Sequence, residues 1–258
     1  MATQTSTPRI TEWDEPTRKR MLWFGLLFIA TFITSIPAVI LMGPAFDQAD
    51  YVLGSGNDRQ VTIGALLELG LVVVNAGTAI ALFPLARRFS EGVALGYVGS
   101  RIFESVMIGV GLVSVLSIVT LRQDIAGAGT TDAASLMAAS AALVAIKDWT
   151  FLFGPAFCSG FGNGILLGYL MFKSGLMPRR MAIFGMFAGV MAVGTATAVM
   201  FGAYEQMSLI SFLFTGPEII WESTIGIYLT VKALKLGRAR LASRETSDHM
   251  SAAPLPGA

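Results

Sequence analysis

Long apolar runs separated by short polar segments dominate the pattern of residues along the chain. The runs lack a regular polar face, so they differ from the amphipathic helices that cover a soluble core. About 20 apolar residues in a helix cross the hydrocarbon of a bilayer. On that criterion the sequence predicts six membrane-spanning helices, at 21–42, 62–85, 93–120, 150–172, 181–203 and 209–231. We therefore expect an all-α integral membrane protein built as a bundle of six transmembrane helices.

The polar ends of the chain complete the expected organisation. Residues 1–20 are predicted to form an N-terminal arm, 21–235 a single transmembrane domain, and 236–258 a disordered tail rich in small and polar residues. The first apolar run is long, lacks a small-residue cleavage site and follows about twenty polar residues, so it differs from a signal peptide. We expect it to remain as a membrane anchor.

One further apolar stretch, at 133–146, leaves two interpretations open. It is rich in alanine and has only fourteen residues, which is short for a crossing. An additional crossing would also move the basic residues around Arg179 to the other side of the membrane. The stretch is expected to be an interfacial helix on the outer side or an extension of the fourth span, with Lys147 and Trp149 at the headgroup level.

The lysines and arginines predict the orientation independently of hydropathy. Fourteen of the 18 flank alternate ends of the predicted spans: Arg9, Arg18, Lys19, Arg20, Arg87, Arg88, Lys173, Arg179, Arg180, Lys232, Lys235, Arg238, Arg240 and Arg244. The opposite loops hold only Arg59, Arg122 and Lys147. Because basic residues remain on the cytoplasmic side, both termini are predicted to be cytoplasmic.

Composition agrees with this class and excludes others. Apolar residues make up 54% of the chain and charged residues 14%, and the mean hydropathy is +0.67, outside the range of soluble proteins. A net charge of +1 argues against a nucleic-acid partner. Membrane lipids are the expected surroundings. The single cysteine, Cys158, cannot form an intramolecular disulfide.

Charged residues inside the apolar runs are the best indication of function. The predicted spans contain Arg101, Glu104, Glu68, Glu218 and Glu222. Each would cost roughly 2.5 to 3.5 kcal/mol at the centre of a bilayer if it stayed charged and unpaired. Arg101 and Glu104 share one helix face, as do Glu218 and Glu222. If the three spans are neighbours, all five groups can meet, with Asn75 as an additional polar partner.

Two functions fit such a cluster. One arginine cannot neutralise four carboxylates, so some glutamates must be protonated or face water. A polar cavity made by Arg101, Glu104, Glu222, Glu218, Glu68 and Asn75 could bind or transport a small molecule, with proton coupling as one form of it. Alternatively, the cluster only fixes helix pairing, and the protein has a structural or regulatory role.

Several chemistries are disfavoured by the residues present. The only histidine, His249, lies in the polar tail, and no aspartate lies within a span. Haem, zinc and Ser/His protease chemistry therefore have no ligands or base in the membrane. Ser159 is expected to serve helix packing, and no phosphate-binding glycine loop is present. Neither a cofactor nor a metal is expected, and an enzyme is disfavoured.

Small residues predict close helix packing. Ala156, Gly160, Gly164 and Gly168 recur every fourth residue in the fourth predicted span, and Gly185 and Gly189 repeat the spacing in the fifth. Such stripes allow two backbones to approach closely. Packing between neighbouring helices of one chain is the first interpretation, and a dimer face is the alternative.

A loop and four charged residues resemble a known family. The segment from Ser174 through Gly175, Leu176, Met177, Pro178, Arg179 and Arg180, followed by Ala182 and Gly185, is similar to a signature loop of the bacterial membrane family called domain of unknown function 4386. Glu68, Arg101, Glu104 and Glu222 also resemble that family's pattern. The resemblance covers about 21–235. It implies a six-helix bacterial membrane protein and brings no assigned reaction.

Overall fold

The computed structural model describes residues 9–10, 12–47, 51–54, 56–126 and 133–252. Within these ranges every regular element is a helix. The elements are α1 (Glu15–Asp47), the 3₁₀ turn η1 (Tyr51–Leu53), α2 (Asp58–Ala86), α3 (Glu91–Ala126), α4 (Ala133–Phe151), the π-helix η2 (Leu152–Leu167), α5 (Gly168–Ser174), α6 (Arg179–Met200) and α7 (Leu209–Ala252).

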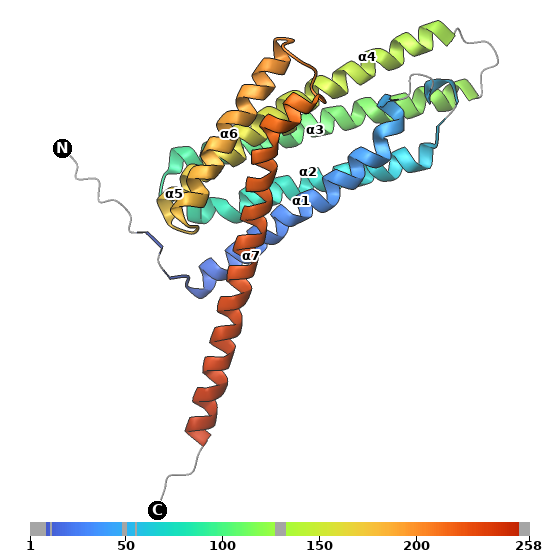
Figure 1. Cartoon of the computed structure of the whole chain (residues 1–258). Coiled ribbons are helices and arrows are strands. Elements are labelled where there is room, and N and C mark those ends of the chain that lie inside the picture. Colours follow the sequence, from blue (N-terminus) through green and yellow to red (C-terminus); the bar gives the residue numbers. More distant parts are fainter. Residues whose placement is uncertain (1–8, 11, 48–50, 55, 127–132, 253–258) are drawn as a thin grey trace, which may run out of the picture.

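The long helices form a closed ring in chain order. Helix α1 packs on α2, α2 on α3, α3 on η2, η2 on α6, α6 on α7, and α7 returns to α1. Figure 1 shows α1, α2, α3 and α4 side by side, with α7 crossing α1 and extending beyond the bundle. This closure brings residues far apart in the sequence to a common interior.

Five segments are long and apolar enough to cross a membrane. Within the described part of the chain they are Glu15–Phe46, Asp58–Ala86, Glu91–Asp124, Ala133–Ser174 and Arg179–Met200. Helix α7 is not among them, although its first half is largely apolar, because Glu218 and Glu222 lower the mean hydropathy of that half. The structure therefore supports a helical membrane protein.

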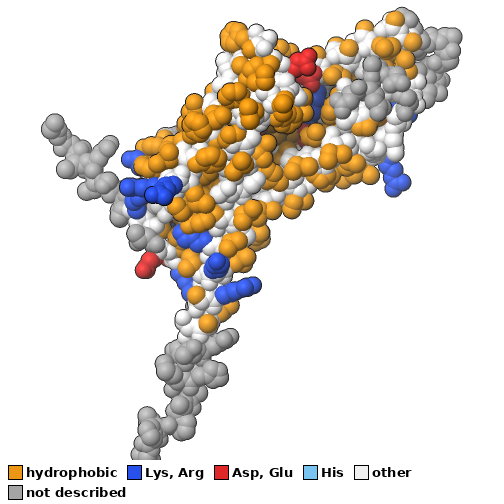
Figure 2. Space-filling view, in the orientation of Figure 1, with side chains coloured by type: hydrophobic (Ala, Val, Ile, Leu, Met, Phe, Trp, Pro, Cys, Tyr) orange, Lys and Arg blue, Asp and Glu red, His pale blue; other side chains and the backbone are white. Residues whose placement is uncertain are grey.

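The exterior of the bundle is apolar, as a lipid-facing surface requires. Ile40, Val73 and Ile80 have 67%, 67% and 73% of their side-chain surfaces exposed. Figure 2 shows hydrophobic side chains over most of the visible face, with basic side chains gathered at the end of the bundle near α5 and along α7. Such a surface would be poorly soluble in water.

The stretch 133–146 does not form a separate interfacial helix. Residues Ala133–Ser174 run without interruption through α4, η2 and α5, which matches the alternative of an extended fourth span. No glycine or proline between 134 and 153 ends the helix. Lys147 was expected at the headgroup level, but its side chain is buried, because it pairs with Glu68 on α2.

The middle of this long segment is π-helical and packs closely on α6. A π-helix joins each amide to the carbonyl five residues earlier and is rare over such a length. A Cβ added to Gly164 would lie 2.2 Å from the Cα of Gly189, and one added to Gly160 would lie 2.8 Å from the Cβ of Ala192. The small-residue stripes therefore serve packing between neighbouring helices of the chain.

The described parts of both polar ends are folded. Helix α7 continues to Ala252, where a disordered tail from 236 was expected, because alanine, leucine and arginine in this segment favour a helix. At the other end, the backbone amide of Thr17 donates to Asp14 Oδ1 over 2.9 Å and caps α1. Trp13 is only 3% exposed, and its carbonyl accepts a hydrogen bond from Arg240. The segment that precedes the first span therefore packs on α7.

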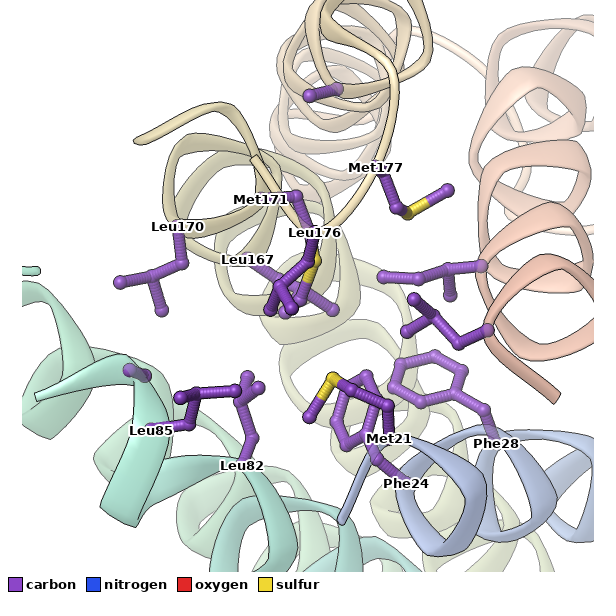
Figure 3. Close-up of a cluster of buried hydrophobic side chains, with 14 of the residues drawn as sticks. Met21, Phe24, Phe28, Leu82, Leu85, Leu167, Leu170, Met171, Leu176 and Met177 are labelled. Atoms are coloured by element: carbon purple, nitrogen blue, oxygen red, sulfur yellow. The ribbon is translucent and has the colours of Figure 1, made fainter. Parts of the chain in front are cut away.

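Two apolar clusters fill the interior at opposite ends of the bundle. Figure 3 shows the first, with Met21, Phe24 and Phe28 of α1 facing Leu82 and Leu85 of α2 and side chains near α5. The second joins the other ends of α1, α2 and α3 and includes Met42, Val61 and Val115. The buried polar residues of α2 and α3 lie between these clusters along each helix.

Candidate functional site

Arg101 is the centre of a closed hydrogen-bond network between α2 and α3. Its Nη1 donates to Glu104 Oε2 over 2.7 Å, its Nη2 donates to Asn75 Oδ1, and its Nε donates to Thr78 Oγ1 over 3.2 Å. The amide of Asn75 donates in turn to Glu104 Oε1 over 3.1 Å. Arg101 is 2% exposed, with its guanidinium over the Phe28 ring at 5.6 Å. The charge of Arg101 is therefore paired within the protein.

Glu222 on α7 is held differently, by neutral donors. Ser159 Oγ and Asn163 Nδ2, both on η2, donate to Glu222 Oε1 over 2.6 Å each. The neighbouring Trp221 donates its indole N–H to the Asn163 carbonyl over 2.8 Å. Among the described residues no lysine or arginine forms an ion pair with Glu222. The carboxylate of Glu222 is thus oriented without being neutralised.

Both networks line a cavity of about 120 Å³ inside the ring. Its walls come from four helices and the π-helix: Phe28, Thr31, Phe32, Ser35, Leu71, Asn75, Arg101, Glu104, Ile108, Pro155, Ser159, Asn163 and Glu222. This volume is large enough for several waters or a ligand of a few non-hydrogen atoms. The cavity lies between the two apolar clusters, so it is a polar chamber within an otherwise apolar interior.

The walls of the cavity favour a hydrogen-bond donor as occupant. With the acids ionised, Arg101 offsets Glu104 and the charge of Glu222 remains. In addition, the side-chain carbonyl of Asn163 is buried and accepts no hydrogen bond within the described structure. A buried acceptor without a partner costs free energy. Among the described residues the chamber therefore presents the Glu222 carboxylate as its charged acceptor, whereas Asn163 Oδ1 beside it is too buried for an occupant to reach.

Two of the six sequence candidates lie outside this cavity. Glu68 pairs with Lys147 at 2.5 Å, in contact with α4 and away from Arg101. Glu218 is 2% exposed, and neither carboxylate oxygen has a hydrogen-bond partner in the described part of the chain. A Cβ on Gly164 would meet the Glu218 carboxylate at 2.7 Å, so this acid points toward η2. The predicted meeting of all five charged groups is wrong.

The structure gives roles to four polar residues that sequence reasoning missed: Thr78, Ser159 and Asn163 at the site, and Lys147 as the partner of Glu68 outside it. Thr78 and Asn163 each lie within an apolar run, where a polar side chain is itself a signal. Ser159 was assigned to helix packing, yet its hydroxyl binds Glu222. Lys147 was placed at the headgroups because it lies beside Asp148 and Trp149. Their partners are 23 to 79 residues away, so local pattern could not reveal them.

Metal binding gains no support from the geometry. Within the described ranges, no three histidine, cysteine, aspartate or glutamate side chains converge as they would around a metal ion. The cavity brings together only two carboxylates, one of which is paired with Arg101. Its chemistry is that of hydrogen bonding and charge compensation.

Comparison with known proteins agrees with the resemblance seen in the sequence. Neither the curated proteins nor the solved structures contain a significant match. A family model, however, matches residues 23–233, which span the bundle from α1 to α7 and include every residue of the cavity. The chain therefore belongs to the family described as domain of unknown function (DUF4386).

Proposed function

We propose that the protein binds or transports a small molecule through the cavity between Arg101 and Glu222. The observation that carries this proposal is the chamber itself, in which an acid without a cationic partner lies beside an unpaired acceptor. Polar groups in a membrane interior are costly and usually mark a ligand or ion pathway. A structural protein would not need a cavity at this point.

We infer a bundle that crosses the membrane six times, with both termini in the cytoplasm. Helix α7 closes the ring by packing on α6 and α1, and its acids face the interior, which offsets their low hydropathy. The asymmetry of lysines and arginines supports the same orientation. We place the protein in the cytoplasmic membrane of a bacterium as a multi-pass protein.

Transport requires that the chamber open to each side in turn, and the helices around it contain suitable elements. Pro217 lies five residues before Glu222 on α7 and provides no backbone N–H for the helix. Pro155 lies in the π-helix that carries Ser159 and Asn163. Helices bend at prolines and π-helical turns. Proton coupling would use Glu222, whose protonation removes the unbalanced charge.

A structural or regulatory role is the second candidate, and one observation favours it. The Arg101 network satisfies all of its charged groups and joins α2 to α3, as helix pairing alone would require. In that case Glu104→Gln and Glu222→Gln would lower thermal stability, while no small molecule would protect the protein. The two candidates are therefore separated by ligand-dependent stability.

Three small compounds of matched shape test the first candidate. Acetamidinium, acetamide and acetate each have four non-hydrogen atoms and differ in charge. Purified protein in detergent is heated with each compound, and unfolding is followed by tryptophan fluorescence. A compound that binds the cavity raises the midpoint in proportion to the logarithm of its concentration, and Glu222→Gln abolishes the shift.

Two controls complete this experiment. Glu205→Gln makes the same charge change at an exposed loop residue and should retain the shift of the wild type. In proteoliposomes with an internal pH dye, an imposed gradient of the stabilising compound should move protons in the wild type and not in Glu222→Gln. If none of the three compounds stabilises the wild type more than Glu222→Gln, the proposed function is overturned.

A further inference from the structure

A groove on the outer face of the bundle leads to the cavity. It lies between α1 and α7, has a volume of about 310 Å³, and is lined by Phe28, Ile29, Phe32, Ile33, Glu222, Ser223, Gly226 and Ile227. Three of these residues, Phe28, Phe32 and Glu222, also line the polar cavity. Glu222 therefore stands at the boundary between an apolar groove and a polar chamber.

The side walls of the groove face the bilayer. Ile33 is 65% exposed and Ile227 is 57% exposed, although both are large hydrophobic residues on helices of the transmembrane bundle. Lipid is the environment that such side chains require. A molecule in this groove would reach Glu222 from the membrane, without crossing a water-filled entrance.

The acceptors at the inner end of the groove define the charge of its occupant. Among the described residues the Glu222 carboxylate has only neutral donors, and the side-chain carbonyl of Asn163 beside it has none. A group with positive charge and N–H donors would satisfy the Glu222 carboxylate. An anion would face Glu222 and find Arg101 already occupied by Glu104, Asn75 and Thr78.

The groove itself defines the remainder of the ligand. Apart from Glu222 and Ser223, its lining consists of aromatic, aliphatic and glycine residues. The Ser223 hydroxyl donates to the carbonyl of Ile219 within α7, so it is engaged in its own helix. Apolar surface gains free energy when it leaves water for such a lining, and the ring of Phe32 can also face a cation.

We propose that the ligand is an amphiphilic monovalent cation, which enters from the lipid between α1 and α7 and places its N–H donors against Glu222. This inference rests on the proposed function, because it names the ligand class of the same cavity. It adds the sign of the charge, the apolar body and the route of entry.

The test uses benzamidinium, benzamide and benzoate, which share one shape and differ in charge. They are compared with the acetamidinium series in the same thermal unfolding assay, with dissociation constants derived from the concentration dependence. Benzamidinium should bind the wild type about tenfold more tightly than acetamidinium, because its ring is buried in the groove. Glu222→Gln should weaken benzamidinium about tenfold or more, and Glu205→Gln should leave it unchanged.

A second variant tests the route through the groove. Ser223 lines the groove but not the cavity, so Ser223→Phe should weaken benzamidinium about tenfold and leave acetamidinium within about twofold of the wild type. Its unfolding midpoint without ligand shows that the variant is folded. If Ser223→Phe and the wild type bind benzamidinium equally well, the inferred entry through the groove is wrong.

The other outcomes separate this inference from the proposed function. If acetamidinium binds through Glu222 and benzamidinium binds no better, the inference that the ligand has an apolar body is wrong. The proposed function of the cavity then stands. If acetate or benzoate binds best, the inference that the ligand is a cation is wrong. The proposed function of the cavity again stands. If no compound of either series distinguishes the wild type from Glu222→Gln, both proposals fail.

Discussion

Lys147 Nζ lies 2.5 Å from Glu68 Oε1, and this ion pair joins α4 to α2 inside the bundle. Both side chains are less than a tenth exposed. A Cβ added to Gly111 of α3 would lie 3.0 Å from Cδ of Lys147 and 2.6 Å from the Thr150 hydroxyl. The pair explains why an apolar helix carries a lysine at a depth where lipid alone would exclude it.

Breaking this pair on one side should be more harmful than replacing both residues. Lys147→Met leaves the Glu68 carboxylate buried without its cation, and such losses cost about 3 to 5 kcal/mol. Lys147→Met combined with Glu68→Leu removes both charges and should recover most of the lost stability. Chemical denaturation in detergent measures the difference, and single variants as stable as the wild type would show that water reaches the pair.

Helix α6 offers a matched pair of glycine substitutions. A Cβ at Gly189 would lie 2.4 Å from the Gly160 carbonyl, whereas a Cβ at Gly194 meets nothing within 4 Å. Gly189→Ala should therefore destabilise the protein by about 1 to 3 kcal/mol through overpacking. Gly194→Ala should be neutral or stabilising by up to about 1 kcal/mol, because alanine favours the helix. Similar unfolding midpoints for the two variants would contradict the close contact between η2 and α6.

Tyr51, in the connection between α1 and α2, should titrate at high pH. Burial raises the pKa of Tyr51 to about 12, and the hydrogen bond from its hydroxyl to Asp58 over 2.9 Å acts in the same direction. Since the unfolded chain ionises first, this contribution to stability is present below about pH 10 and is lost as the pH rises toward 12. Ultraviolet absorbance is titrated for the wild type and for Tyr51→Phe, and the difference between the two curves gives the pKa of Tyr51. A difference curve centred near pH 10 would show that the hydroxyl is in water.

The proposed sixth crossing can be tested at the two ends of α7. In a Cys158→Ser background, single cysteines replace Glu205 and Lys235, which are both exposed. If α7 crosses the membrane, an impermeant maleimide should label Glu205→Cys on intact cells and label Lys235→Cys only after lysis. Labelling of both cysteines from the same side would show that α7 does not cross.

Much of the membrane architecture was accessible from the residues alone. Apolar runs of bilayer length predicted helices around the observed α1, α2, α3 and α6, because hydrocarbon requires every backbone group to be bonded within its own segment. The same reasoning identified Arg101, Glu104, Asn75 and Glu222, since polar groups at membrane depth are conspicuous in an apolar run. At 133–146 it left an interfacial helix and an extension of the fourth span both open, and packing decided for the extension. Beyond 236 polarity suggested a disordered tail, whereas helix propensity continues α7 to Ala252.

Only the tertiary structure decided which polar groups meet. Glu68 was expected beside Arg101 but pairs with Lys147, and Glu222 lies against Ser159 and Asn163. These contacts depend on how the helices rotate and cross within the closed ring, which hydropathy does not specify. Composition thus determined that these side chains had to find partners within the membrane. The packing of the helices selected each partner and left Glu222 without a cationic partner among the described residues.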